Sequence, residues 1–285
     1  GRRRGGSGTV VKSSVPSTVS EYNQEISRLG KEGNWMAALK LLSDMQPAGF
    51  PPNVVSYNSA MAALNRNGQW KKALDMFQEL EKQGLAPDTI SYSSALTACS
   101  KGSKWRRALE LHKEMSEKGV EANEFTYNAL IMAMENGGET QRALDFFKQM
   151  EDEGIKANVY TYTAAISACE KDGKWEDALG LLERMSKEGI KPNLKAYSAA
   201  ISACEKAKQA KPAMGLLERM TNDGIEPDTI AYSAAICACG NAGLAEAAQK
   251  LFEDMKRSGH KPDVVAYSSL IRACSAGGQS EKALE

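Results

Sequence analysis

A 35-residue period runs through this chain of 285 residues and constrains its fold more than any other feature. The phrase PNVVSYNSA (52–60) returns with small changes as PDTISYSSA (87–95), PNLKAYSAA (192–200) and PDTIAYSAA (227–235). When each unit begins three residues before the tyrosine, the units are 19–53, 54–88, 89–123, 124–158, 159–193, 194–228 and 229–263, with a partial unit at 264–285. Repetition at a fixed period of this size is typical of stacked structural repeats.

Three places within the unit keep the same residue throughout the chain. A tyrosine stands at place four of all eight units: Tyr22, Tyr57, Tyr92, Tyr127, Tyr162, Tyr197, Tyr232 and Tyr267. Place twenty holds Ala38, Ala73, Ala108, Ala143, Ala178, Ala213 and Ala248, and place thirty-one holds Gly49, Gly84, Gly119, Gly154, Gly189, Gly224 and Gly259. Such agreement without any insertion or deletion indicates one repeat array from residue 19 onward.

Each unit is predicted to contain two helices. In unit 54–88, apolar residues recur at helical spacing from Val55 to Leu64 and again from Trp70 to Leu80. One helix pair cannot bury its apolar face alone, so neighbouring pairs must stack. The sequence shows no strand pattern, and it therefore predicts an all-α fold, an α-solenoid superhelix of stacked antiparallel helix pairs.

The ends of these helices are also marked in the sequence. The first helix of unit 54–88 should end near Asn67 and Gly68, and the second at Gly84, since glycine suits the left-handed residue that ends a helix. Pro87 cannot continue that helix, and Asp88 stands where an N-cap would begin the next one.

The charge balance excludes the simplest argument for a nucleic-acid partner. Lysine and arginine number 36, as do aspartate and glutamate, so a nucleic-acid interface would depend on where the charges lie. No stretch approaches 18 consecutive apolar residues, so neither a membrane-spanning helix nor a membrane partner is expected. Residues 1–18 begin GRRRGGSG, and we expect them to form a disordered basic linker rich in Gly and Ser.

The cysteines are predicted to be packing residues. Five of the six lie 35 or 70 residues apart, at one place of the unit: Cys99, Cys169, Cys204, Cys239 and Cys274. Cys237 and Cys239 have no further ligands at metal spacing, and only His112 and His260 could assist. No metal and no other cofactor is therefore expected.

The 35-residue unit VVSYNSAMAALNRNGQWKKALDMFQELEKQGLAPD resembles the pentatricopeptide repeat family, and the resemblance extends from Val19 to the last residue. It depends on Tyr followed by Asn, Ser or Thr, on Ala at place twenty, on Met at place twenty-seven, on Gly at place thirty-one, and on a final Pro-Asp or Pro-Asn. Ala122 and Ala157 replace that proline in two units. A tetratricopeptide array, which binds peptides, would have a period of about 34 residues.

The resemblance implies binding of single-stranded RNA with one base per unit. It assigns base recognition to places five and thirty-five, base clamping to place two and phosphate contact to a basic residue at place thirteen. The base-reading residues are then Asn23, Asn58, Ser93, Asn128, Thr163, Ser198 and Ser233 at place five, and Asn53, Asp88, Asn123, Asn158, Asn193, Asp228 and Asp263 at place thirty-five.

Each of these roles has a competing structural explanation. Plain helix capping would account for Asn and Asp at place thirty-five, but it would also admit Ser and Thr, which are absent there. An ordinary polar helix surface would place Glu, Lys and Gln at place five, and none occurs. Both places are therefore predicted to contact bases, and capping can coexist with that role at place thirty-five.

The clamps and phosphate contacts follow in the same way. Place two holds Val55, Ile90, Phe125, Tyr160, Ile230 and Val265, with Ser20 and Lys195 as exceptions, and the alternative is a packing role at the helix start. Place thirteen holds Lys31, Arg66, Lys101, Lys171 and Lys206, with Asn136 and Asn241 as exceptions, and the alternative is stabilisation of a helix C-terminus. Acidic residues such as Glu79, Glu81, Glu151 and Asp152 fall on the second helices.

Tryptophans open the second helix of four units, at Trp35, Trp70, Trp105 and Trp175. Aromatic side chains could stack on bases. We instead expect them to pack between helices, because Ala210 and Ala245 replace them in other units. Met45, Met115, Met150, Met185, Met220 and Met255 are expected to fill the core.

The pairing pattern of the family implies a target sequence. Asn with Asn implies a pyrimidine, Asn with Asp implies U, Ser or Thr with Asn implies A, and Ser with Asp implies G. The seven full units then specify 5′-Y-U-A-Y-A-G-G-3′, where Y is a pyrimidine. From the resemblance we expect an organelle transcript, whose stability, processing, splicing or translation is affected, with chloroplast favoured over mitochondrion.

Two other classes of function compete with RNA binding. A helical-repeat scaffold that binds protein, such as a structural subunit of an organellar ribosome or of another complex, would not require short polar residues at place five. An enzyme would need a catalytic domain beyond Glu285, because the array has two histidines and no nucleophile or phosphate-loop motif. We therefore expect no catalytic residue and no enzymatic activity.

Overall fold

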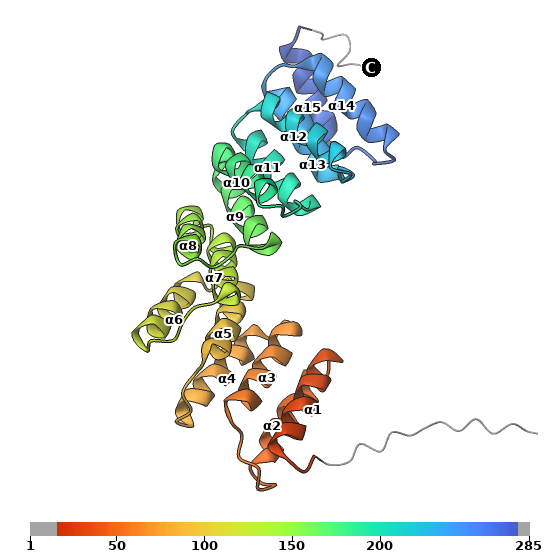
Figure 1. The fold of residues 1–285 in the computed structure, drawn as a ribbon. Helices are drawn as coiled ribbons and strands as arrows, with labels where there is room; N and C mark the ends of the chain where they lie inside the picture. The colour runs from red at the N-terminus through yellow and green to blue at the C-terminus, as the bar shows by residue number, and fades with distance from the viewer. Residues whose placement is uncertain (1–15, 279–285) are drawn as a thin grey trace, which may run out of the picture. The chain divides into compact units, whose positions relative to one another are not determined.

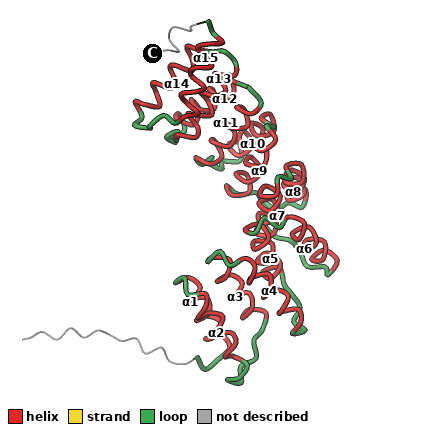
Figure 2. The backbone as a smooth tube through the Cα atoms, turned by 180° about the vertical axis from the view of Figure 1, so that it is seen from behind, coloured by secondary structure: helices red, strands yellow, loops and turns green. Residues whose placement is uncertain are grey.

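The computed structural model describes residues 16–278, and within them all regular secondary structure is helical (Figure 2). The helices are α1 (Val19–Lys31), α2 (Trp35–Met45), α3 (Val54–Arg66), α4 (Trp70–Lys82), α5 (Thr89–Lys101), α6 (Trp105–Glu117), α7 (Glu124–Gly137), α8 (Thr140–Asp152), α9 (Val159–Asp172), α10 (Trp175–Lys187), α11 (Leu194–Lys206), α12 (Ala210–Asn222), α13 (Thr229–Asn241), α14 (Ala245–Arg257) and α15 (Val264–Ala276). The predicted linker at 1–18 lies outside the described residues up to residue 15, as does the end of the partial unit from residue 279.

Each odd-numbered helix begins at the first place of a sequence unit, because the preceding residue caps it. Asn53 accepts a hydrogen bond from the Ser56 main-chain nitrogen at 3.0 Å, which satisfies one of the unpaired donors at the start of α3. The predicted helix ends are confirmed. Helix α3 stops at Arg66, immediately before Asn67, and α4 stops at Lys82, two residues before Gly84, whose φ is +73°.

The helices pack as two bodies, Gly1–Ala98 and Cys99–Glu285. In the first body, α1 packs against α2 and α3, and α3 packs against α4 (Figure 1). In the second body, α9 packs against its partner α10 and against α7 and α11, and α13 is related in the same way to α14, α11 and α15. A first helix thus contacts its own second helix and the next first helix, which is the arrangement of a helical-repeat array.

The constant tyrosine lies in the core. Tyr92, Tyr127, Tyr162 and Tyr197 are fully buried, whereas Tyr267 in the partial unit is 49 % exposed. In three units the tyrosine ring contacts a phenylalanine in the second helix of the preceding unit, as in Phe147 and Tyr162, whose ring centroids are 4.9 Å apart. Such pairs add about 0.5–1.5 kcal/mol beyond the burial of their area. The tyrosine therefore packs the first helix of its unit against the second helix of the preceding unit.

The tryptophans lie between helices, as expected. All four are half-buried at the start of a second helix. Trp105 of α6 packs so closely on Gly137 of α7 that a Cβ at residue 137 would lie 2.4 Å from the indole. Lys72 Nζ stands 4.2 Å from the Trp35 ring centroid, and Trp35 and Trp70 pack against the core formed by Leu64, Ala73 and Ala98. The described contacts of these rings support the packing role.

All six cysteines are buried free thiols. Burial raises the pKa of Cys99 and Cys169 to about 12 and that of Cys204 and Cys239 to about 11. A buried thiol that stays protonated is a packing residue and not a nucleophile. Across residues 16–278, no helix combines the length and the apolar character needed to cross a bilayer.

Candidate nucleic-acid interface

The predicted base and phosphate contacts fall on one face of the first helix of each unit. In α9, places two, five and thirteen are occupied by Tyr160, Thr163 and Lys171. Thr163 lies three residues after Tyr160, and Lys171 lies eleven residues after it. At 3.6 residues per turn these three positions lie within about 80° of one another around the helix. The cap residue at place thirty-five precedes the next first helix, and that helix packs beside this one.

The two predicted base-reading side chains of a unit are joined by a hydrogen bond in five units. Asn58 Nδ2 donates to Asp88 Oδ1 at 3.0 Å, and Ser233 Oγ donates to Asp263 Oδ1 at 3.1 Å. The pairs Asn23–Asn53, Thr163–Asn193 and Ser198–Asp228 are each joined at 3.4 Å. Residues 30 positions apart in the sequence thus form one polar site per unit.

The remaining two units differ in how these side chains are placed. Asn128 and Asn158 are bridged by Thr161, whose hydroxyl lies 2.5 Å from Asn128 Oδ1 and 3.2 Å from Asn158 Oδ1. Ser93 and Asn123 belong to different bodies. Ser93 is buried in α5, and Asn123 caps α7.

The residues at place thirty-five also cap the following helix. Asn53, Asn123, Asn158, Asn193, Asp228 and Asp263 are N-caps whose side chains accept a main-chain N–H, and Asp88 accepts from Ser91 in the same way at 2.8 Å. Capping therefore coexists with any contact to a base, as predicted. The cap holds the side chain in one place before any ligand arrives.

The pKa of the Asp88 carboxyl is lowered by the hydrogen bonds that it accepts. Burial acts to raise its pKa, but the hydrogen bonds donated by Ser91 and Asn58 outweigh burial and lower the pKa below its usual value. The carboxylate is therefore ionised at neutral pH and can only accept hydrogen bonds. The Asp88 carboxylate therefore holds the Asn58 side chain with the amide nitrogen facing Asp88.

The residues predicted to clamp bases are exposed. Val55, Ile90, Phe125, Tyr160, Ile230 and Val265 have exposed fractions of 50–70 %. A residue whose role was packing at the helix start would be buried, so the packing alternative for place two is wrong. Ser20 and Lys195, the two exceptions in sequence, are exposed as well. Place two therefore presents a row of accessible side chains, mostly apolar, beside the polar sites.

A pocket of about 410 Å³ lies over one of the polar sites. It is lined by Ser198 and Asp228 together with Lys195 and Ile230, the place-two residues of two successive units, and by Asn193 and Leu194. The pocket therefore brings places two, five and thirty-five together around one space. Hydrogen-bonding side chains together with the place-two side chains of two units suit a flat ring that stacks and hydrogen-bonds along its edge.

The basic residues at place thirteen lie in the last turn of the first helices. Lys31, Arg66, Lys101, Lys171 and Lys206 are all exposed. Their position beside a helix C-terminus is also electrostatically favourable, so the alternative role applies at the same time. The exception Asn136 turns its amide nitrogen to the Ser100 carbonyl oxygen at 3.0 Å and is engaged within the protein.

Sequence reasoning missed an acidic residue beside these cations. Glu135, Glu170 and Glu205 occupy place twelve of three successive first helices, so the acidic residues are not confined to the second helices. Lys171 Nζ donates to the main-chain oxygen of Glu135 and lies 4.0 Å from its carboxylate. The 35-residue spacing of the three glutamates was visible in the sequence, but their position beside the lysines required the register of the helices.

Glu170 stands among several charges. Burial raises its pKa, Glu135 raises it further, and Lys206, Lys171 and Lys195 act in the opposite direction. A carboxylate among three lysines reduces the positive potential that a phosphate would meet there. Part of the cationic row in units 159–193 and 194–228 is therefore neutralised internally.

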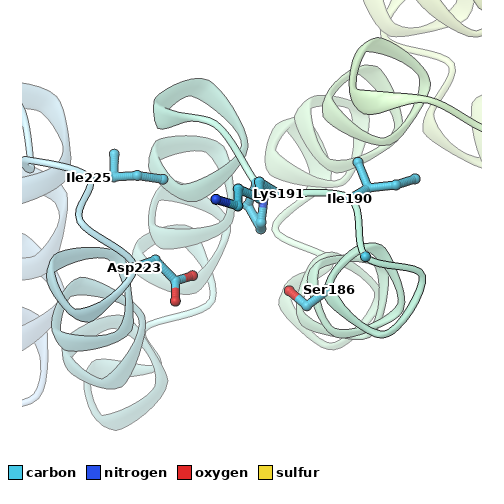
Figure 3. A pocket seen from close by; sticks show the side chains of 7 residues that line it. Ser186, Ile190, Lys191, Asp223 and Ile225 are labelled. Carbon is cyan, nitrogen blue, oxygen red and sulfur yellow. The ribbon is translucent and has the colours of Figure 1, made fainter.

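Another pocket lies away from these residues. It has a volume of about 380 Å³ and is formed between the ends of α10 and α12. Figure 3 shows Asp223 and Ile225 on one side and Ser186 and Ile190 on the other, with Lys191 between them. None of the residues predicted to contact RNA lines this pocket, so it is separate from the candidate interface.

Comparison with known families decides the classification. The model described as "Pentacotripeptide-repeat region of PRORP" matches residues 87–247, and the model "PPR repeat family" matches residues 52–101 and 227–276. The chain is a pentatricopeptide repeat protein. No curated protein sequence matches it significantly.

Solved pentatricopeptide repeat structures share the fold. The maize protein PPR10 aligns with a TM-score of 0.54 at 20 % identity, over 95 % of this chain and 48 % of PPR10. PPR10 in complex with an 18-nucleotide psaJ RNA element aligns with a TM-score of 0.53 at 20 % identity, over 95 % and 50 % of the two chains. This chain therefore spans about half the length of PPR10.

A shorter relative aligns over almost its whole length. The PPR domain of Arabidopsis thaliana protein-only RNase P 1, in complex with tRNA, has a TM-score of 0.56 at 20 % identity, over 70 % of this chain and 99 % of that domain. These similarities confirm the predicted all-α solenoid of pentatricopeptide repeats. Within residues 16–278, no cluster of His, Cys, Asp and Glu side chains is arranged to hold a metal ion.

Proposed function

We propose that this pentatricopeptide repeat protein binds single-stranded RNA along its first helices, with one base at each unit. The observation that carries the proposal is the pairing of places five and thirty-five: five units hold these two short polar side chains within 3.0–3.4 Å of each other. Exposed place-two side chains stand beside them. The solved complexes of PPR10 with an RNA element and of the RNase P 1 domain with tRNA support RNA as the class of ligand.

The proposed target is 5′-Y-U-A-Y-A-G-G-3′, in the order of the units from 19–53 to 229–263. The distribution of side chains supports recognition of different bases along the array. Place-five amides occur in the units assigned to pyrimidines, and place-five hydroxyls occur in the units assigned to A and G. Asparagine presents a donor and an acceptor side by side, whereas serine presents one rotatable hydroxyl, so the two side chains favour different base edges.

We further propose that the RNA is an organelle transcript, with chloroplast favoured over mitochondrion. The effect of binding would be on transcript stability, processing, splicing or translation, because a protein that covers a single strand blocks nucleases and competing base pairs. The repeat array itself is proposed to act without catalysis, through occupancy of the RNA alone.

Direct binding tests this function. The chain should bind an RNA containing CUACAGG more tightly than a scrambled RNA of equal composition, measured by fluorescence anisotropy at two salt concentrations. Seven positions that each contribute even a small preference should give at least a tenfold difference in Kd, since about 1.4 kcal/mol corresponds to a factor of ten. Equal affinity for the two RNAs would contradict sequence recognition, and no binding would favour a protein-binding scaffold.

The place-thirteen cations predict a change in salt dependence. Replacing Lys101 and Lys171 together with Ala should lower the slope of log K against log salt by about 1.4, because each phosphate contact on a single strand contributes about 0.7. All RNAs should weaken alike. The matched control replaces Lys113 and Lys187, which lie on second helices of the same two units and remove the same charge. An equal fall in slope for the control would show that net charge alone matters.

A further inference from the structure

In two of the three units with an asparagine at place five, the residue at place three of the following unit donates a hydrogen bond to the amide oxygen of that asparagine; the Asn23 amide oxygen has no hydrogen-bond partner. Ser91 is place three of the unit that follows 54–88, and its Oγ lies 2.7 Å from Asn58 Oδ1. Thr161 is place three of the unit that follows 124–158, and its Oγ1 lies 2.5 Å from Asn128 Oδ1. Ser91 and Thr161 are both fully buried, so these hydroxyls are held beneath the amides and away from solvent.

The hydrogen-bond pattern around Asn58 gives the hydroxyl its direction. Asp88 Oδ1 already accepts from the Ser91 main-chain nitrogen at 2.8 Å and from Asn58 Nδ2 at 3.0 Å. The Asp88 main-chain nitrogen donates to Ser91 Oγ at 3.3 Å. Ser91 has one hydroxyl proton, and its shorter contact is to Asn58 Oδ1 at 2.7 Å, against 2.9 Å to Asp88 Oδ1. The Asn58 amide is therefore bound at its oxygen by Ser91 and at its nitrogen by Asp88.

An amide that is hydrogen-bonded at both its oxygen and its nitrogen cannot rotate to exchange these two atoms. Asparagine has two acceptor sites on Oδ1 and two N–H donors on Nδ2. The two internal bonds use one of each, which leaves one acceptor and one donor in a fixed left-to-right order for a base. At positions 4 and 3 of the pairing edge, uracil presents an acceptor and then a donor, whereas cytosine presents a donor and then an acceptor. The orientation of the amide therefore decides which of the two pyrimidines it can bind with both groups.

The sequence varies in step with this geometry. All three asparagines at place five, Asn23, Asn58 and Asn128, are followed by a hydroxyl at place three of the next unit: Ser56, Ser91 and Thr161. Three of the four place-five hydroxyl residues, Thr163, Ser198 and Ser233, are followed instead by alanine: Ala196, Ala231 and Ala266. A single hydroxyl reorients by rotation about its own bond, so it has no amide orientation that needs fixing.

We infer that place three of the next unit is a third specificity-determining position, which orients the place-five asparagine and so sets the choice between uracil and cytosine. The inference rests on the proposed RNA function. Ser91 is a positioning residue: it is buried beneath Asn58 and acts on the base only through that amide. Binding of a base at Asn58 thus depends on two units and not on one.

The test replaces Ser91 with Ala and measures the ratio of Kd values for RNAs with C or U at the second nucleotide. The native chain should prefer U, and Ser91→Ala should reduce that preference about 3- to 10-fold, the effect of one hydrogen bond. Ser91→Thr should keep the preference, because Thr161 makes the same contact with Asn128. An unchanged U-to-C ratio in Ser91→Ala would overturn the inference.

Thr126→Ala is the matched control. Thr126 and Ser91 each bond the cap residue three positions earlier, so both substitutions remove the same capping contact. The place-five residue before Thr126 is Ser93, which has no amide. Thr126→Ala should therefore keep the preference for A at the third nucleotide. If both variants merely weaken all RNAs by a similar factor, Ser91 is only part of a helix cap and the inference is overturned.

A measurement without RNA separates this inference from the proposed function. The side-chain amide resonances of Asn58 in the ¹⁵N–¹H spectrum should move in Ser91→Ala and stay close to native in Ser91→Thr. If the native chain binds no RNA, the proposed function fails, whatever the spectrum shows. If it binds RNA with the predicted preference while the amide resonances are insensitive to Ser91→Ala, the positioning contact alone is wrong.

Discussion

Replacing Ser233 with Asn is expected to change the preferred base of unit 229–263 from G to U. Ser233 Oγ and Asn58 Nδ2 occupy equivalent places, and each donates to the carboxylate of its own unit, at 3.1 Å to Asp263 and 3.0 Å to Asp88. An asparagine at 233 therefore finds an acceptor already fixed as the N-cap of α15. It gains a donor and an acceptor for a pyrimidine edge and loses the small hydroxyl that leaves room for a purine.

The expected size of this change is large. A good two-bond contact to a base gives about 1–3 kcal/mol of discrimination, which is roughly 5- to 150-fold in Kd. The measurement compares Kd values for RNAs with G or U at the seventh nucleotide, for the native chain and for Ser233→Asn. The sixth unit provides an internal control, because Ser198 and Asp228 form the same type of pair and their preference for G should not move.

The same variant also tests the further inference. Ala266 follows Ser233 at place three of the next unit, so an asparagine at 233 would be bound only at its nitrogen. The double variant Ser233→Asn, Ala266→Ser should favour U over C more strongly than Ser233→Asn alone. A seventh position that still prefers G in both variants would refute the role of place five.

Replacing Gly240 with Ala is expected to destabilise the end of the array. Gly240 lies in α13, where a Cβ would be 2.5 Å from the main-chain oxygen of Ser269 and 3.2 Å from its carbonyl carbon. These are backbone atoms of α15, so the clash is relieved only if the helix moves. Overpacking of this kind costs about 1–3 kcal/mol. Because repeats contact their neighbours, the effect should concentrate in α13–α15.

The matched control is the same substitution at Gly180. This glycine lies inside α10, and a Cβ there would meet no atom within 4 Å. Gly180→Ala should therefore stabilise the protein by about 0.5–1 kcal/mol, through helix propensity alone. Urea unfolding followed by far-ultraviolet circular dichroism measures both, and amide hydrogen exchange in α15 should accelerate only in Gly240→Ala. Stabilisation by both substitutions would show that α13 and α15 do not approach as described.

Much of the fold was predictable because it depends on local signals. The cap at Asp88 and the left-handed Gly84 mark helix boundaries, and the tyrosine at place four marks a core position, as the structure confirms. These features act over a few residues, and the fixed period carries them along the chain. The exposure of Phe125 and Tyr160 was harder to predict, because a sequence cannot show whether an apolar residue at a helix start contacts another helix.

The charged face of the first helices was predicted less well. Lys171 was assigned to phosphate contact, and it also lies within hydrogen-bond reach of the Glu135 main-chain oxygen, in the neighbouring first helix. Residues 36 positions apart meet only after adjacent first helices have packed side by side. The amount of positive charge available to a ligand is therefore a property of the packed array and not of the composition.

The sequence by itself determined the repeat period, the helix boundaries, the core positions and the membership of a family, because each depends on residue type at a fixed place in a unit. Tertiary structure alone decided which residues distant in the sequence meet: Asn58 with Asp88 and Ser91, Lys171 with Glu135, and Gly240 with Ser269. The physical reason is that these contacts arise from the register between neighbouring helices, which side-chain packing sets to within a fraction of a turn.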